Sequence, residues 1–303
     1  MNKDQERAWK SAEKAASAER KRQLDKARSD VVDLLKDARG EITVILAGTP
    51  TEYQEWRLTA LQREIDRVLR ELGQASSRIM AEAVGKAWEG GIGAIDVPMG
   101  AAGIRVLMPL LDSKQMMEIR AFTVDRISDI STVASARIKQ QIGLSMIGAQ
   151  SLQETIGNVA AHLAETSVSR ASMIVRDSLS SAWSTASYDR ALQSDGAGVR
   201  MKKTWRRSGK VFSRIAHDLA DGTCIPIDQP FVINGSNIRH PHDPAAPLAE
   251  VINCGCICLY FPDGTYGTLP NKRPFTTDEL ALNPYKAEIQ SGRSVAQLLR
   301  DLN

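Results

Sequence analysis

The sequence predicts an α+β protein in which a long, mainly α-helical N-terminal region precedes a small α+β C-terminal domain. Three observations predict this class. Apolar residues recur at helical spacing before residue 195, aromatic residues make up only 5% of the chain, and short apolar runs with turn signals follow Gly196. A chain of 303 residues has room for about two domains. We therefore expect domains at 1–195 and 196–303.

The first helices are predicted from two narrow apolar seams that step by three and four residues. The first seam is formed by Leu24, Ala27, Val31, Leu34 and Ala38. The second is formed by Leu58, Leu61, Ile65, Val68 and Leu72. We expect Gly40 and Gly73 to end these helices. Paired seams are typical of helices that pack within one bundle or against a neighbouring subunit, and both alternatives remain open.

Further helices are expected at about 76–89, 114–140, 151–166 and 168–194. The run Gly90-Gly91-Ile92-Gly93 lacks the GxxxxGK[ST] pattern of a phosphate-binding loop, and we expect it to break a helix. Glycines at 143 and 148 separate the next two helices.

After residue 196, short strands are expected at 225–227 and 231–233, flanking a turn, and another strand is expected at 251–261. Asp221-Gly222 and Asn234-Gly235 are typical turn dipeptides. Thr276 begins a helix-start signal, and a terminal helix is expected at 294–302.

Composition excludes several classes of protein. The formal net charge is +3, from 39 basic and 36 acidic residues, so the chain is not a globally basic nucleic-acid coat. Four cysteines are too few for a disulfide scaffold. No run approaches the roughly 18 apolar residues of a membrane span, and the charged N-terminus is unlike a signal peptide. We expect a soluble protein, made in a reducing cytosol, with no membrane contact.

The most informative stretch lies between residues 205 and 256. Its marked positions are Trp205, Arg214, His217, Asp221, Gly222, Asn253, Cys254 and Cys256. This constellation resembles the phage head morphogenesis family, the minor head proteins similar to protein F of phage Mu. The sequence departs from the family pattern at Gly255, where arginine is common, and at Lys210 and Phe212, where the family often has an acidic residue and an arginine.

The resemblance implies a structural role without catalysis. The expected protein is a minor capsid component of the virion, located in the phage head near the portal vertex and assembled in the host cytoplasm. Its implied partners are the portal protein or the major capsid protein, with several copies on a symmetric ring. The helical region would supply the docking surfaces, and the small domain would be a rigid module. Trp205 is expected to anchor the core of that module.

Thiols and imidazoles in this stretch suit a structural zinc ion. The candidate ligands are His217, His240, His242, Cys254 and Cys256. On a strand, Cys254, Cys256 and Cys258 would share one face. Two alternatives remain open: the cysteines are small buried side chains, or Cys224 forms a disulfide with one of them.

A run of basic residues precedes the motif. Its members are Arg200, Lys202, Lys203, Arg206, Arg207 and Lys210, with no acidic residue among them. Such a run contacts nucleic-acid phosphates or an acidic partner surface, or it is a solvated face. We expect Arg214 to pair with Asp218 or Asp221 inside the fold.

Two other functions remain open from the sequence. One is a metal- or cysteine-dependent hydrolase carried on a helical arm, in which His217 activates Cys254 or Cys224 and Asp221 orients the imidazole. The other is a DNA-binding internal head protein that uses the basic run.

Overall fold

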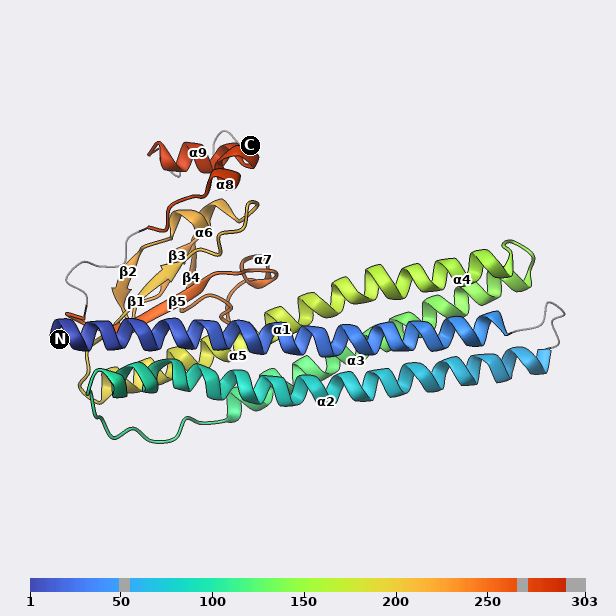
Figure 1. The fold of residues 1–303 in the computed structure, drawn as a ribbon, viewed down its shortest axis with the longest axis horizontal. Coiled ribbons are helices and arrows are strands. Elements are labelled where there is room, and N and C mark those ends of the chain that lie inside the picture. The colour runs from blue at the N-terminus through green and yellow to red at the C-terminus, as the bar shows by residue number, and fades with distance from the viewer. Residues whose placement is uncertain (49–54, 266–271, 293–303) are drawn as a thin grey trace. The chain divides into compact units, whose positions relative to one another are not determined.

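A computed structural model describes residues 1–48, 55–265 and 272–292, and it confirms the α+β class (Figure 1). The long helices are α1 (Lys3–Ala47), α2 (Glu55–Ala101), α3 (Lys114–Met146), α4 (Leu152–Ala161) and α5 (Val168–Gly196), and a π-helical turn (His162–Ser167) joins the last two. The smaller elements are β1 (Met201–Arg206), α6 (Ile215–Leu219), β2 (Cys224–Pro226), β3 (Phe231–Ile233), β4 (Ser236–Ile238), α7 (Leu248–Val251), β5 (Ile257–Pro262), α8 (Thr277–Leu282) and α9 (Pro284–Gln290).

The compact units differ from the predicted division at residues 195 and 196. One unit contains residues 21–86 and 113–179, and the other contains residues 1–20, 87–112 and 180–303. The difference arises because α1, α2 and α5 each contribute residues to both units. We call these units the bundle unit and the sheet unit.

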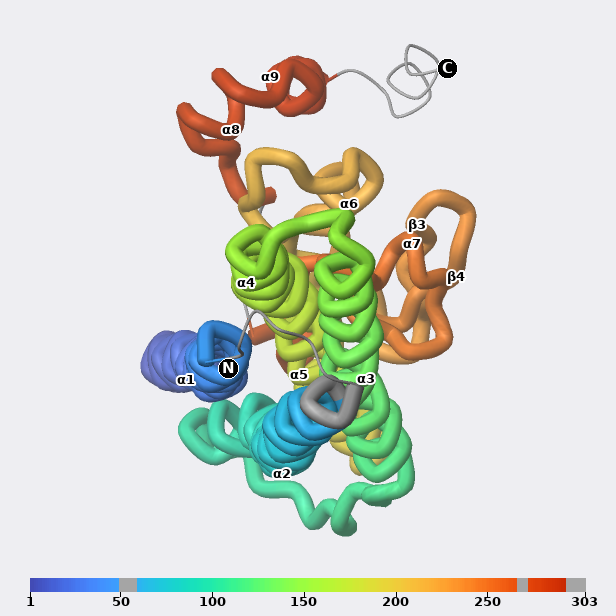
Figure 2. The backbone as a smooth tube through the Cα atoms, turned by 90° about the vertical axis from the view of Figure 1, so that its right-hand side faces the viewer, coloured from blue at the N-terminus to red at the C-terminus, as the bar shows by residue number. Residues whose placement is uncertain are grey.

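The bundle unit is built from α1, α2, α3 and the α4–α5 limb, which Figure 2 shows end-on. Polar contacts join each neighbouring pair. Arg67 of α2 lies 2.7 Å from Glu41 of α1, and Arg170 of α5 lies 2.5 Å from Asp129 of α3. Most of the predicted seam residues that the structure describes are buried: Ala27, Val31, Ala38, Leu61, Ile65, Val68 and Leu72. The apolar seams therefore pack within one bundle, which is one of the two alternatives left open by the sequence.

In the sheet unit, the ends of three long helices pack with a three-stranded antiparallel sheet of order β2-β1-β5. Trp9 of α1, Met99 of α2 and Tyr188 of α5 share a buried cluster with Met201, Ile227 and Phe261. A second buried cluster contains Trp205, Phe231, Ile233, Ile238, Ala246, Cys254 and Cys256. Trp205 is 1% exposed, as expected for a core anchor.

The predicted strands exist, but their pairing is different from a simple hairpin. The segment at 225–227 overlaps β2, which pairs with β1, whereas β3 pairs with β4. Asn234-Gly235 forms the two-residue turn between β3 and β4, since Ile233 lies opposite Ser236 and both turn residues have positive φ. The predicted strand at 251–261 is shorter, because α7 ends at Val251 and β5 begins at Ile257.

Three expected helix breaks are wrong. Helix α1 continues through Gly40, and α2 continues through Gly73 and through the run at 90–93. The glycines of α2 permit close packing instead of ending the helix. A Cβ at Gly90 would lie 2.2 Å from the Trp183 ring, and one at Gly91 would lie 2.5 Å from the Trp183 carbonyl oxygen. The helices of the sheet unit meet at these two positions.

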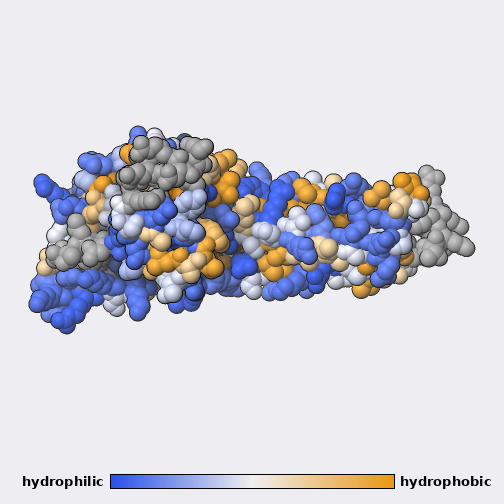
Figure 3. Space-filling model, turned by 90° about the horizontal axis from the view of Figure 1, so that it is seen from above, coloured by the Kyte–Doolittle hydropathy of each residue, from blue (hydrophilic) through white to orange (hydrophobic). Residues whose placement is uncertain are grey.

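The predicted capping signal at Thr276 is confirmed, since Thr276 and Glu279 form a reciprocal capping box on α8. The predicted terminal helix at 294–302 lies outside the described residues. Among the helices described, none is both long enough and apolar enough to cross a membrane. On the face seen in Figure 3, apolar residues form small groups among hydrophilic ones.

Replacing Gly91 by alanine should destabilise the fold by about 1–3 kcal/mol, because the new Cβ collides with backbone atoms of α5. The matched control is Gly93→Ala on the same helix, where a Cβ meets no atom within 4 Å. That change should be neutral or stabilise the helix by up to about 1 kcal/mol. The measurement is the free energy of unfolding in urea, and equal effects of the two substitutions would contradict the packing argument.

Candidate metal centre in the sheet unit

His217, Cys254 and Cys256 form the one three-residue group in the described part of the chain that is placed to hold a metal ion. Nδ1 of His217 lies 3.5 Å from Sγ of Cys254 and 3.6 Å from Sγ of Cys256. Donor atoms around a tetrahedral zinc ion are roughly 3.5–3.8 Å apart, given the usual zinc–nitrogen and zinc–sulfur distances. The three side chains are buried, so their donor atoms face one another and not water. The residue types and spacing therefore fit a metal ion.

Local backbone features place the two cysteines. They lie on the segment between α7 and β5, next to Asn253, which has a φ of 59°. Asparagine tolerates this left-handed conformation better than most residues. At Gly255, a Cβ would lie 2.8 Å from Cβ of Ser208, so the larger residue common in the resembled family does not fit without movement. These features turn both sulfurs toward α6.

The His217 ring is held from two sides. The Trp205 ring packs edge-on against it, with centroids 5.2 Å apart and an interplanar angle of 88°. Nε2 of His217 lies 2.8 Å from Oε2 of Glu250, whose other oxygen accepts a hydrogen bond from the Asn234 side chain. An ionised carboxylate can only accept, so Nε2 carries a proton and Nδ1 is free to act as a ligand toward the sulfurs. Carboxylate–histidine pairs of this kind orient metal ligands.

Electrostatic interactions couple these groups. Burial alone would lower the pKa of His217, but Cys254 and Glu250 more than offset burial and raise it. The hydrogen bond from Cys256, followed by the interaction with His217, lowers the pKa of Cys254 to about 3 in spite of burial. The same hydrogen bond and burial raise the pKa of Cys256. These shifts favour a thiolate at Cys254, the form of cysteine that binds metals, and metal binding would displace any proton held between Cys254 and Nδ1 of His217.

The structure does not bring the other two predicted ligands into this group. His240 Nδ1 lies 3.0 Å from the Pro241 carbonyl oxygen, and the ring packs on Tyr188. His242 is buried, and neither of its ring nitrogens has a hydrogen-bond partner among the described residues. Burial lowers the pKa of each to about 4, so both imidazoles are neutral at pH 7.

The other cysteines are also separate from the group. Cys258 lies on β5 opposite Trp205, and it is the one residue of Cys254, Cys256 and Cys258 that belongs to a strand. The expectation that all three share a strand face is therefore wrong. Cys224 is half-buried on β2. All four cysteines are free thiols in the structure, so Cys224 forms no disulfide with any of the other three.

The basic run does not form a continuous solvated face. Lys203 is 0% exposed, and its Nζ donates to the Arg239 carbonyl oxygen at 2.7 Å beside the Tyr188 and Phe231 rings. Arg207 is 2% exposed and pairs with Glu279. For Lys203 and Arg207, the expected contact with an external partner is wrong because both side chains are enclosed.

The remaining members of the run are closer to the surface, and most have internal partners. Lys202 pairs with Asp263 at 2.8 Å, and Arg206 pairs with Asp221 at 3.2 Å. Lys210 donates to the Asn253 carbonyl oxygen at 2.5 Å, beside the cysteine segment. Arg200 is exposed.

The predicted pairing of Arg214 is wrong. Its guanidinium donates to the Ile252 carbonyl oxygen at 2.7 Å. Asp218 accepts from Ser213 and faces Lys286, while Asp221 accepts from the backbone N–H groups of Arg207 and Arg273. Asp221 therefore fixes backbone segments and does not orient His217, a role that Glu250 takes. Glu250 was not predicted, since it lies 33 residues from His217 without a shared motif.

A buried charge cluster ties α8 and α9 to the sheet unit. Arg207 lies 2.5 Å and Lys286 2.7 Å from Oε1 of Glu279, and all three side chains are 1% exposed. Lys286 also donates to the Lys210 carbonyl oxygen, and the Arg207 guanidinium packs on the Phe275 ring at 4.2 Å. Burial alone would raise the pKa of Glu279, but the bonds from Arg207 and Lys286 lower it to about 2.

Comparison with known proteins adds no relative, since no family model, no curated protein and no solved structure matches the chain.

Glu279→Gln should destabilise the protein by about 3–5 kcal/mol, because it leaves the buried Arg207 without a counter-charge and leaves Lys286 with only the more distant Asp218, at 3.6 Å. The matched control is Asp263→Asn, which breaks the partly exposed pair with Lys202 and should cost less than about 1 kcal/mol. Because the folded-state pKa of Glu279 is lowered, its contribution is present above about pH 4.5 and is lost as pH falls toward 2. The measurement is urea unfolding across this pH range. Similar losses for both variants would contradict the cluster's role.

Proposed function

We propose that the chain is a structural assembly protein, a minor head protein that acts at the portal vertex of a tailed phage. The observation that carries the proposal is the burial of the motif residues. Trp205, His217, Cys254 and Cys256 pack against one another inside the sheet unit. Residues that brace a fold belong in such a place, whereas residues that turn over a substrate need access to it. The resemblance of this motif to head morphogenesis proteins supplies the biological role.

The proposed partners are the portal protein or the major capsid protein. A helical bundle exposes long, rigid helix faces, and several copies around a symmetric ring gain affinity from many weak contacts. The proposed location is the virion head, after assembly in the host cytoplasm.

Within this role, we propose a structural zinc ion held by His217, Cys254 and Cys256. The ion would supply a cross-link between α6 and the segment that precedes β5, in a unit whose sheet has three short strands. Glu250 would orient His217 from behind.

One observation favours a second candidate, a cysteine hydrolase. Cys254, His217 and Glu250 lie in the order nucleophile, base and orienting carboxylate. Two features argue against it. Cys254 is 3% exposed, and the second thiol of Cys256 lies equally close to the same imidazole nitrogen. A metal needs both thiols, and a hydrolase needs one thiol with access to substrate.

Purified protein should contain about one zinc ion per chain by elemental analysis. Cys254→Ser and Cys256→Ser should each lose the metal and lower the thermal midpoint, because each removes a donor from the cluster. Cys224→Ser is the control, since Cys224 lies outside the group and should keep the metal. Folded wild-type protein without metal, or rapid alkylation of Cys254 with loss of an esterase activity, would contradict the zinc proposal.

The assembly role predicts that portal and terminase reading frames flank this gene. Co-expression with that portal protein should give a complex that co-elutes in size-exclusion chromatography, with several copies of the chain per ring. Cys254→Ser should weaken this complex only as far as it unfolds the sheet unit, which circular dichroism reports. A metabolic operon around the gene, or a portal ring that elutes without the chain, would contradict the proposed assembly role.

A further inference from the structure

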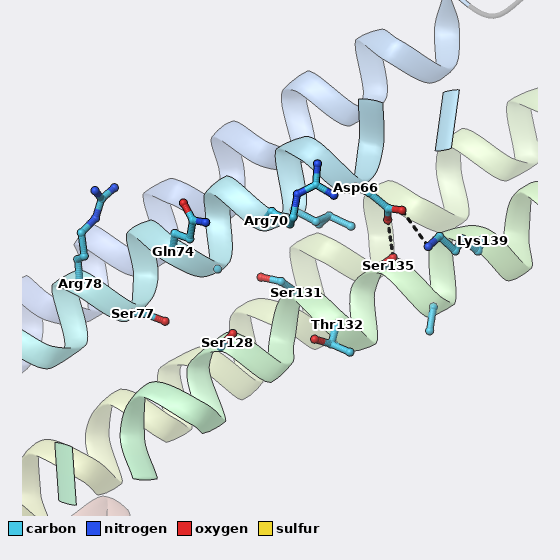
Figure 4. A pocket seen from close by; sticks show the side chains of 13 residues that line it. Asp66, Arg70, Gln74, Ser77, Arg78, Ser128, Ser131, Thr132, Ser135 and Lys139 are labelled. Atoms are coloured by element: carbon cyan, nitrogen blue, oxygen red, sulfur yellow. Dashed lines mark hydrogen bonds and ion pairs between the residues drawn. The ribbon is translucent and has the colours of Figure 1, made fainter. Parts of the chain in front are cut away.

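A groove of about 870 Å³ runs along the bundle unit between α2 and α3 (Figure 4). Its existence follows from small side chains. The helices meet at Gly73, where a Cβ would lie 3.0 Å from Oγ of Ser131. Beside this contact, most lining residues are serine, threonine, glycine or alanine, and the buried Leu69 lies among them. The small lining residues are Gly73, Ser77, Ser128, Ser131, Thr132, Ser135 and Ala136.

The groove is basic. Three cations line it, Arg70, Arg78 and Lys139, with the single carboxylate of Asp66. Figure 4 shows that Asp66 is engaged across the helices, with Ser135 donating at 2.7 Å and Lys139 at 2.9 Å. These two partners more than offset burial and lower the pKa of Asp66. Arg70 and Arg78 are exposed, and the charge of Arg70 also contributes to lowering that pKa.

The lining has the periodicity and length of a helix-binding groove. On α2, Asp66, Arg70, Gln74 and Arg78 recur at steps of four residues and so form one stripe. Twelve residues of helix span about 18 Å, which matches three turns of a ligand helix. Because most of the lining residues are small, the backbone of a third helix could approach α2 and α3 closely. Larger side chains would keep it away.

We infer that this groove binds an acidic helix of a partner protein. The small and apolar lining would pack against the small side chains of that helix, and Arg70 and Arg78 would pair with carboxylates about two turns apart. A DNA duplex is about as wide as two helices side by side and does not enter such a groove, and its phosphates would also meet Asp66. The inference rests on the proposed assembly role, because that role supplies a partner, and it adds the partner's chemistry.

The test uses the full chain and fluorescence anisotropy. The probe is a labelled, stapled helical peptide of about four turns, rich in alanine and leucine, with glutamates about two turns apart. The control peptide has the same sequence with glutamine in place of each glutamate. The acidic peptide should bind about tenfold more tightly than the control peptide, since two ion pairs of the usual surface strength give that ratio of affinities.

Variants locate the binding site. The double substitution Arg70→Glu and Arg78→Glu should weaken binding of the acidic peptide about tenfold or more. Thr132→Trp, at an exposed lining position, should do the same by filling the groove. Arg63→Glu, an exposed arginine of α2 outside the lining, should have little effect.

Three results would overturn the inference: equal binding of both peptides, an Arg63→Glu effect as large as that of the double variant, or tighter binding of a short DNA duplex than of the acidic peptide. The proposed function is tested separately by the portal complex. If that complex forms while the acidic peptide does not bind, the groove inference fails and the assembly role stands.

Discussion

The sheet unit depends on burying polar and ionisable groups with partners that satisfy them. An imidazole, two thiols and a carboxylate meet around His217, and two cations share the carboxylate of Glu279. Each group would be costly to bury alone, since an unpaired charge or polar atom loses its hydration and gains no hydrogen bond or ion pair in exchange. Removing one partner therefore leaves the others uncompensated. These pairings also tie short segments of the unit to one another, because α6, α8 and α9 contact the sheet segments through them.

In the long helices the corresponding constraint is close approach. Gly73, Gly90 and Gly91 lie where the α2 backbone comes nearest to atoms of another helix within the same unit. A helix loses some stability for each interior glycine, but at Gly90 and Gly91 a Cβ would collide with α5, and at Gly73 it would crowd the Ser131 hydroxyl. The same use of small residues that packs two helices together also leaves the groove beside Gly73 unfilled.

Much of the fold could be predicted from local patterns. The seams, the capping box at Thr276 and the Asn234-Gly235 turn are short-range signals, and the structure has all three. The helix breaks at Gly40 and Gly73 were wrong because a glycine inside a helix looks the same in the sequence as one that ends it. Gly73 lies at a packing contact with Ser131, whereas Gly40 is exposed and is simply tolerated within α1. His217, Cys254 and Cys256 were predicted from residue type. Neither Glu250, the partner of His217, nor Glu279, the partner of Arg207 and Lys286, was predicted, since long-range pairing of ordinary acidic residues leaves no local signal.

The residue types around His217 allow two interpretations. A thiol, an imidazole and a carboxylate in sequence can form an activated nucleophile, and the same groups can form an oriented set of metal ligands. Burial and the equal distances of the two thiols favour the ligand set. A nucleophile gains nothing from a second thiol at the same distance from its base, and it gains nothing from a position closed to solvent. Both features are what a metal ligand set requires, since every donor must face the ion and water must stay out. The geometry therefore favours a metal ligand set over a nucleophile at this place in the sheet unit.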